Sequence, residues 1–139
     1  MTGLGLVIAR FYEELAAAIE TEARERVRAS DAEHVETVSV PGVYDAPLAA
    51  DRLAQSPDVD AVAVLGVVVT GDTDHDRVVT RAAARKLADV SLNRDTPVTF
   101  GVSGPGMSAD EARERVEYCA DAVDTAVDLA TGLPAATRQ

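Results

Sequence analysis

Four runs of apolar residues alternate along the chain with four stretches that have the periodicity of amphipathic helices. The apolar runs cover residues 4–9, 34–40, 61–69 and 97–103. Three of them contain almost no polar position, which is typical of strands buried on both faces of a parallel sheet. In the run 34–40, polar residues interrupt the valines, so this run is predicted to be an edge strand with one solvent-facing side.

The helix-like stretches are predicted to begin near Tyr12, Pro47, Asp76 and Ser108. The last of them opens with the capping-box spacing of Ser108 and Glu111 and is expected to run as one helix that ends before Gly132. Strict alternation of strand and helix predicts a single α/β domain over residues 1–139, with a loose tail at residues 134–139. In such domains, ligands bind beyond the carboxyl ends of the strands.

The composition narrows the function classes. The chain has 139 residues, 24 Asp and Glu against 13 Lys and Arg, and a formal charge of −11. So acidic a surface repels phosphate backbones, which argues against binding nucleic acid. The longest apolar run, residues 61–69, is far shorter than the ~20 residues of a membrane span, and no signal peptide is apparent. One cysteine, Cys119, permits no internal disulfide, and we expect a cytoplasmic protein with no membrane partner.

The charged residues are also biased by type. Lys86 is the one lysine beside twelve arginines, and alanine and valine take the place of larger apolar residues. Short carboxylates in place of long lysines give a strongly hydrated surface, which favours a halophilic protein of a high-salt cytoplasm. An ordinary acidic protein is the alternative.

The segment after the third strand, residues 70–77, is the richest in candidate chemistry. Its glycine allows a tight turn, and Thr73 with the following amides stands at a helix N-terminus, which is a favourable anion site. His75 lies beside that anion site, and the ordinary pKa of an imidazole, ~6.5, suits proton transfer at neutral pH. Alternatively, Asp74 or Thr73 only caps the helix, and His75 is a solvent-exposed surface residue.

Aromatic residues gather in the other predicted loops. Tyr44 and Asp45 follow the second strand and offer a stacking face and an acceptor for ligand hydroxyls. The alternative makes Tyr44 a plug in the core and Asp45 a helix cap. Together with Phe11, Tyr12 and Phe100, they are expected to place most aromatic side chains near one end of the sheet.

The segment after the fourth strand, residues 103–108, is rich in glycine and lets the backbone approach a ligand closely. Arg113 and Arg115 follow it on the predicted last helix, and either could bind a phosphate through two parallel hydrogen bonds. The alternative pairs them with Glu111 or Glu117 on a solvated helix face.

The four loops together resemble those of the 6,7-dimethyl-8-ribityllumazine synthase family, and the acidic composition favours a haloarchaeal-like member. The matching segments are Arg10-Phe11, Val-Pro-Gly-Val-Tyr-Asp-Ala-Pro at 40–47, Leu-Gly-Val-Val-Val-Thr-Gly-Asp-Thr-Asp-His at 65–75, and Pro-Val-Thr-Phe-Gly-Val at 97–102. The resemblance implies a three-layer αβα flavodoxin-like fold with a four-stranded parallel sheet. It also implies homo-oligomers, as pentamers, decamers or 60-subunit cages, with the site between neighbouring subunits.

The activity that the resemblance implies belongs to riboflavin biosynthesis. The family condenses 5-amino-6-(D-ribitylamino)uracil with 3,4-dihydroxy-2-butanone 4-phosphate to give 6,7-dimethyl-8-ribityllumazine, phosphate and water. It is a transferase that uses no metal and no redox cofactor, so the partners implied are these two small molecules and further copies of the chain.

The resemblance also implies roles for single residues, with His75 as the proton shuttle. The substrate-binding residues include pyrimidine contacts at Phe11, Val68 and Val69, ribityl contacts at Tyr44 and Asp45, and phosphate contacts at Gly71, Asp72, Thr73 and Arg115. Val43 and Val67 are further implied substrate-binding residues. Phe100 would come from the adjacent subunit. Departures from the family pattern are Asp45 for the usual glutamate, Tyr12 for the usual asparagine, and the lack of a lysine in the last helix.

Three other functions compete with this one. An archaeal-type riboflavin synthase, which dismutates dimethylribityllumazine, would share the fold and several motifs. The loop around His75 favours the lumazine-forming reaction, because only a reaction that releases phosphate needs an anion pocket there. A non-catalytic flavodoxin-like ligand-binding domain and an inactive shell protein remain further alternatives.

Overall fold

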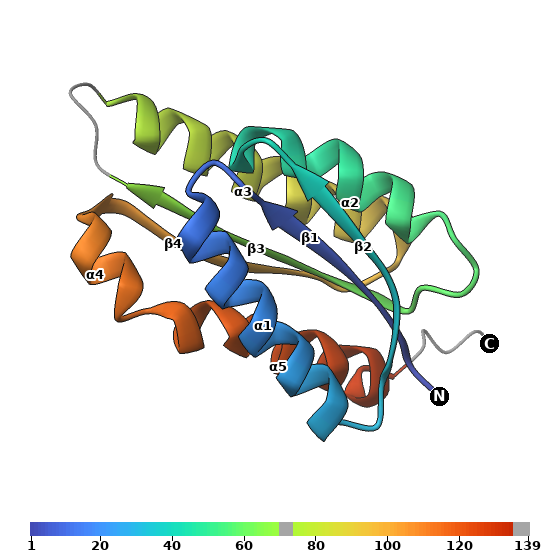
Figure 1. Ribbon diagram of the computed structural model, residues 1–139. Coiled ribbons are helices and arrows are strands. Elements are labelled where there is room, and N and C mark those ends of the chain that lie inside the picture. The colour runs from blue at the N-terminus through green and yellow to red at the C-terminus, as the bar shows by residue number, and fades with distance from the viewer. Residues whose placement is uncertain (70–73, 135–139) are drawn as a thin grey trace.

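The sheet has four parallel strands in the order β2-β1-β3-β4 (Figure 1). The computed structural model describes residues 1–69 and 74–134. The strands are β1 (Gly3–Ala9), β2 (Glu33–Val40), β3 (Ala61–Val69) and β4 (Val98–Met107). The predicted α/β fold with a parallel four-stranded sheet is therefore confirmed.

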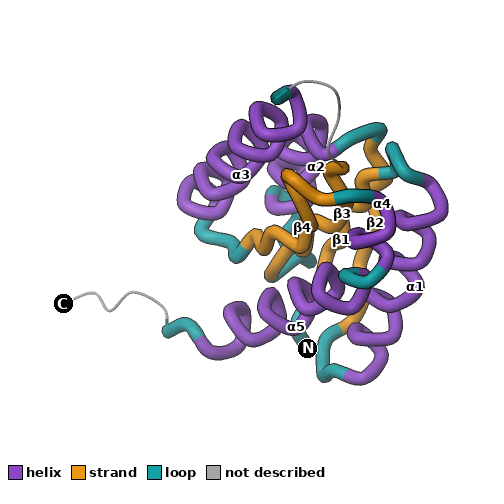
Figure 2. The backbone as a smooth tube through the Cα atoms, turned by 90° about the vertical axis from the view of Figure 1, so that its left-hand side faces the viewer, coloured by secondary structure: helices purple, strands orange, loops and turns teal. Residues whose placement is uncertain are grey.

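Helices cover both faces of the sheet and make the three layers (Figure 2). One face packs against α1 (Glu13–Ala29) and α5 (Val116–Gly132), and the other packs against α2 (Ala46–Ala54) and α3 (His75–Arg94). A short helix, η1 (Val43–Asp45), lies between β2 and α2, and α4 (Ala109–Arg113) precedes α5. No helix within the described residues is long and apolar enough to span a membrane.

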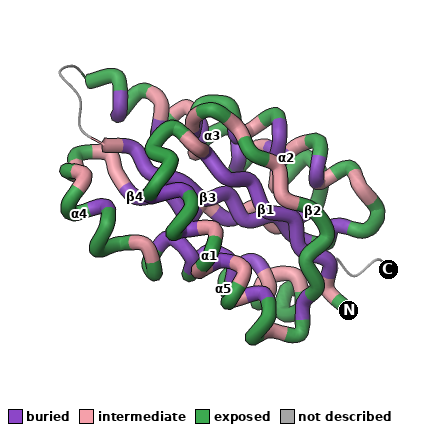
Figure 3. The backbone as a smooth tube through the Cα atoms, viewed as in Figure 1, coloured by how far each residue is buried: buried purple, intermediate pink, exposed green. Residues whose placement is uncertain are grey.

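Burial follows the hydrophobic pattern of the strands (Figure 3). Every residue of β1 is buried, and β3 is buried up to Val68, because helices cover both sides of these central strands. Strand β2 is mostly exposed and forms one edge of the sheet, as its polar positions predict. The central strands are therefore tightly packed almost to their carboxyl ends, and they give the loops that follow them a rigid support.

Strand β4 is longer than predicted, because the segment 104–107 continues the strand instead of forming a loop. Met107 pairs with Val69 after an irregularity in the register. Gly104 has a φ of 100°, and a Cβ there would lie 2.0 Å from the carbonyl oxygen of Val68. The glycines that suggested a loop instead let the backbone of β4 lie directly against the end of β3.

The last helix is also corrected, since it is divided into α4 and α5. Its start is as predicted, because Ser108 Oγ accepts a hydrogen bond from the Glu111 amide at 3.2 Å and the Ser108 amide donates to Glu111 Oε1 at 3.3 Å. The turn then tightens, with the Arg115 amide donating to the Ala112 carbonyl at 3.0 Å. Arg115 thus stands at the junction between the two helices.

Candidate active site

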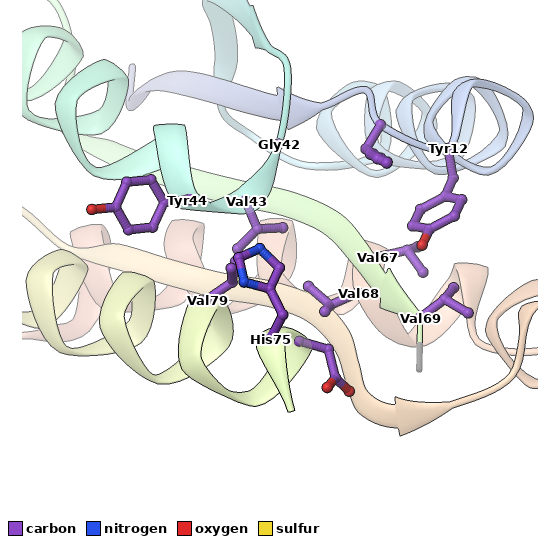
Figure 4. A pocket seen from close by; sticks show the side chains of 11 residues that line it. Tyr12, Gly42, Val43, Tyr44, Val67, Val68, Val69, His75 and Val79 are labelled. Atoms are coloured by element: carbon purple, nitrogen blue, oxygen red, sulfur yellow. The ribbon is translucent and has the colours of Figure 1, made fainter. Parts of the chain in front are cut away.

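A pocket of about 290 Å³ lies at the carboxyl ends of β1 and β3 (Figure 4). Its walls come from the ends of β1, β2 and β3 and from the start of α3, where ligand sites occur in folds of this kind. The lining residues are Phe11, Tyr12, Gly42, Val43, Tyr44, Val67, Val68, Val69, His75, Asp76 and Val79. The first three candidate loops therefore converge on one site, as the sequence predicts.

In the segment between β2 and α2, the adjacent side chains of Val43 and Tyr44 face opposite ways, so the tyrosine ring is exposed. Val43 is buried in the core with 4% of its surface exposed, whereas Tyr44 is 65% exposed. Tyr44 is therefore not a core plug. With Val43 anchoring η1, the tyrosine is displayed at the rim of the pocket.

The segment after β1 adds two further rings. Phe11 is 67% exposed, and its ring centroid lies 5.0 Å from that of Tyr12 at a tilt of 54°. In Figure 4, Tyr12 points toward the end of β3. Exposed aromatic rings that are grouped beside a pocket are typical of a binding surface.

Arg10, which precedes Phe11, holds this segment in place. Its guanidinium bonds to Glu20 of α1 and, at 3.0 Å, to Ser39 Oγ of β2. Burial opposes ionisation of Glu20, but the hydrogen bonds from Arg10 and Arg24 outweigh it and lower the pKa of that carboxyl. Arg10 therefore serves to fix the exit of β1, which sets the position of Phe11.

Asp45 closes its own turn. Its Oδ2 accepts a hydrogen bond from the Gly42 amide at 3.0 Å, and its side chain makes no capping bond at the start of α2. Asp45 lines the neighbouring hollow between β2 and α2 rather than the pocket itself. It is thus next to Tyr44 in the chain but on the far side of the turn from the lining residues.

His75 is the first residue of α3, one position before the start predicted for that helix. Its ring rises from the start of α3 toward the turn that carries Val43 (Figure 4). The preceding Asp74 is the N-cap residue, but its side chain makes no capping hydrogen bond. His75 is thus an exposed side chain that also lines the pocket.

Three of the predicted phosphate contacts, Gly71, Asp72 and Thr73, lie outside the described residues. Four lining residues were not among the predicted contacts, namely Tyr12, Gly42, Asp76 and Val79. Val79 lies four residues after His75 and so on the same side of α3, a spacing that is visible in the sequence. Asp76 carries no such signal, because a charged residue after a helix start is expected to face solvent.

Phe100 does not lie near the pocket in this chain, which corrects the expectation that it shares one end of the sheet with the other aromatics. Phe100 lies on β4, which is an edge strand of the sheet. It pairs with Val64, which is in the middle of β3 and away from the carboxyl end of that strand. It lines a separate hollow with Tyr118 of α5.

The two candidate arginines differ in their partners. Arg113 bonds to Asp110 at 2.6 Å, and not to the glutamates that the helix spacing suggested. Arg115 lies 5.8 Å from the centroid of the Tyr118 ring and forms no ion pair with another described residue. Arg115 is therefore on the same β4–α5 surface as Phe100, and neither residue lines the pocket.

The pocket has the chemistry for a flat, partly polar ring. Valines from β3 form an apolar floor, exposed aromatic rings stand at the rim, and the imidazole of His75 lines the wall. Within residues 1–69 and 74–134, no three side chains of His, Cys, Asp or Glu gather into a set that could hold a metal ion.

Comparisons with known proteins give the family. Residues 2–133 match the family model described as 6,7-dimethyl-8-ribityllumazine synthase. A protein of that name from Halorubrum lacusprofundi is 61% identical over 133 residues, which cover 96% of this chain and 99% of the relative. One from Halobacterium salinarum is 62% identical over 129 residues, 93% of this chain and 97% of the relative. One from Methanocaldococcus jannaschii is 44% identical over 135 residues, 97% and 96% of the two chains.

Proposed function

This chain belongs to the 6,7-dimethyl-8-ribityllumazine synthase family, and we propose that its pocket condenses 5-amino-6-(D-ribitylamino)uracil with 3,4-dihydroxy-2-butanone 4-phosphate. It is a transferase of riboflavin biosynthesis. The observation that carries the assignment to this pocket is the convergence of the Phe11, Tyr44 and His75 segments on one valine-lined hollow.

The reaction needs positioning and proton transfer rather than a covalent enzyme nucleophile. The amine of the uracil attacks the ketone and loses water to give an imine, and elimination then expels the phosphate. The ribityl-bearing nitrogen closes the ring on the remaining carbonyl, and loss of a second water gives the lumazine. Each step moves protons, and His75 is the lining residue suited to carry them. Holding both substrates together supplies much of the remaining acceleration.

The pyrimidine is proposed to lie on the floor formed by Val67, Val68 and Val69, with Phe11 stacked on its face. The large exposed fraction of Phe11 and the apolar floor opposite support this placement. Backbone groups of Val68 and Val69 would bond to the edge of the ring, because the pairing of β3 with β4 is irregular between Val67 and Val69.

The ribityl chain is proposed to extend along the β2–α2 turn, where Val43 fixes the backbone and Tyr44 offers its ring. Asp45, which lines the neighbouring hollow on the far side of that turn, would accept hydrogen bonds from ribityl hydroxyls that reach beyond the pocket. One of its oxygens already holds the Gly42 amide, and a carboxylate has capacity for further donors.

The phosphate is proposed to bind between the segment Gly71, Asp72 and Thr73 of one subunit and Arg115 of its neighbour. Arg115 is preferred over Arg113, because Arg113 is already bonded to Asp110 whereas Arg115 forms no ion pair with another described residue. An arginine without a carboxylate partner is the one that can bind an incoming phosphate through two hydrogen bonds.

The site is proposed to be completed by a second copy of the chain. The pocket and the β4–α5 surface with Phe100 and Arg115 are separate parts of one chain. Two different patches that join head to tail produce a ring of subunits, and we propose the pentamer that is common in this family. We further propose that the protein works in a cytoplasm of high salt.

The test mixes the purified protein with the two substrates and follows lumazine absorbance and phosphate release together. Equal amounts of the two products are expected. Formation of riboflavin from dimethylribityllumazine alone, without a phosphorylated substrate, would instead identify a riboflavin synthase. No product from either mixture would identify a binding or shell protein.

A further inference from the structure

Asp76 is a buried carboxylate in the wall of the pocket, next to His75 in the chain. Only 8% of its surface is exposed. Its Oδ2 accepts a hydrogen bond from the Gly106 amide of β4 at 3.2 Å. Burying a carboxylate is unfavourable unless it accepts hydrogen bonds. The position of Asp76 therefore depends on its bond to Gly106, and we ask what this bond does for the site.

Asp76 is the one buried side chain in the first turn of α3. His75, Arg77 and Val78 are all exposed. The apolar packing of α3 against the core starts with the partly buried Val79 and continues at Ala83 and Leu87. Backbone bonds inside the helix keep the turn helical, but they do not fix where it lies relative to the sheet. The contact made by Asp76 ties the first turn to β4.

The partner of Asp76 belongs to a closely packed part of the sheet. Gly106 lies between Gly104, which packs against the Val68 backbone, and Met107, which pairs with Val69. The same segment of β4 therefore holds both the valine floor of the pocket and the first turn of α3.

We propose that Asp76 is a positioning residue for His75, which rests on the function proposed above for the pocket. By bonding to Gly106, Asp76 holds the first turn of α3 so that the imidazole stays aimed at the substrate above the valine floor. Small displacements of a reacting group cost large factors in rate, so the loss of this one bond is expected to be visible in kcat.

The variant Asp76→Ala is expected to lower kcat by about 10- to 100-fold at saturating substrates, with smaller changes in KM. Asp76→Asn keeps an oxygen that can accept from Gly106 and is expected to recover most of the activity. Asp74→Ala, which removes an exposed carboxylate on the other side of His75, is the matched control and is expected to leave kcat unchanged. If Asp76→Ala does not fold, Asp76→Glu takes its place, since its longer side chain also shifts the turn.

A double variant separates positioning from general damage. If Asp76 acts through His75, adding Asp76→Ala to His75→Ala causes no further loss, because the positioned group is already gone. A further loss by the same factor as in the wild type would overturn the proposal, and so would a wild-type kcat in Asp76→Ala.

NMR provides a readout that does not depend on the proposed reaction. The chain has two histidines, His34 and His75, so their ring signals are easily told apart. Asp76→Ala is expected to move the His75 signals and leave those of His34 in place, and Asp76→Asn is expected to resemble the wild type. Unmoved His75 signals would refute the positioning role even if the wild type made no lumazine, whereas the activity assay alone decides the proposed function.

Discussion

At the scale of single residues, His75 is the part of the pocket whose removal is most informative. His75→Ala is expected to lower kcat by about 10²–10⁴-fold, because a positioned general acid–base contributes a factor of that size. Turnover should persist at a reduced level, since the rest of the site still aligns the substrates. The measurement is the initial rate of lumazine formation at saturating substrate. His34→Ala is the control, because His34 lies in β2 and does not line the pocket; an unchanged kcat in His75→Ala would refute the shuttle role.

Arg115 makes a different prediction, because it is assigned to binding and not to proton transfer. Arg115→Ala is expected to raise KM for the sugar phosphate by about 10- to 100-fold, the loss that follows from removing charge-assisted hydrogen bonds. KM for the uracil should change little. Arg113→Ala removes an arginine that is bonded to Asp110 and should leave both constants near the wild-type values. Equal effects of the two substitutions would show that neither residue binds the phosphate specifically.

Some residues of the candidate site could be predicted from the sequence alone, and others could not. Tyr44 and His75 could be named as candidates because an aromatic ring and an imidazole follow predicted strands, although a core position for Tyr44 and a surface position for His75 also fitted the sequence. The sequence did not decide whether Val43 or Tyr44 faces the core, because that depends on the phase of a one-turn helix. Asp76 could not be predicted at all, since its burial results from a bond to a strand thirty residues away.

At the scale of elements, ion pairs and hydrogen bonds connect α1 to β2 and to the residue that follows β1. Glu20 of α1 accepts from Arg10 after β1 and from Arg24, whose guanidinium also reaches Thr37 Oγ1 of β2 at 3.3 Å. Because this contact fixes the exit of β1, it links the stability of the edge of the sheet to the position of Phe11.

This network predicts a pH-dependent stability. The folded-state pKa of Glu20 lies below its ordinary value, so its contribution is present above that ordinary value and is lost as the pH falls through the folded value. Glu20→Gln is expected to destabilise the fold by roughly 0.5–1 kcal/mol at neutral pH, after screening by solvent. The difference from the wild type should shrink at acid pH, as the pH falls through the folded-state pKa of Glu20. Urea unfolding at both pH values measures this.

The matched control for Glu20 is Glu25→Gln, which removes an exposed partner of Arg28 on the same helix. It is expected to change stability little at either pH, because exposed ion pairs contribute little. If Glu20→Gln were equally destabilising at neutral and at acid pH, the carboxylate charge would not be the source of its effect.

The bounds of helices and strands were predicted well where burial of apolar side chains determines them. They were predicted less well where backbone conformation determines them. Strand β3 has the predicted bounds, because nine apolar residues in a row leave few other structures. The segment 104–107 was expected to be a loop, since glycine and proline usually interrupt strands, but its close contact with β3 requires a glycine at position 104. The division between α4 and α5 carries no helix-breaking residue and so gave no signal.

At the scale of the whole molecule, the formal charge of −11 is the main physical feature. Part of the acidic surface is neutralised locally, as where Arg26 of α1 bonds to Asp121 and Asp124 of α5. Among the described residues, most acidic side chains form no ion pair, so we expect the negative charges to repel one another at low salt. Two of the relatives come from haloarchaea, which supports the expectation that the protein works at high salt.

The salt prediction follows from screening. The Debye length falls from ~10 Å at 0.1 M salt to ~3 Å at 1 M, so repulsion between carboxylates weakens over this range. The melting temperature is expected to rise by several degrees when KCl is raised from about 0.1 M to about 1 M. Thermal unfolding followed by circular dichroism measures this. A melting temperature that stayed constant or fell would contradict a halophilic adaptation.

A site divided between two copies of the chain can be tested by mixing two defective variants. His75→Ala damages the half of the site that lies at the pocket, and Arg115→Ala damages the half on the β4–α5 surface of the neighbour. When the two variants are co-expressed in equal amounts and purified together through separate tags, about a quarter of the contacts in a ring should pair two intact halves. Lumazine formation at low substrate should then approach a quarter of the wild-type rate, well above that of either variant alone. A mixture no more active than the mean of its two components would show that one chain holds the whole site.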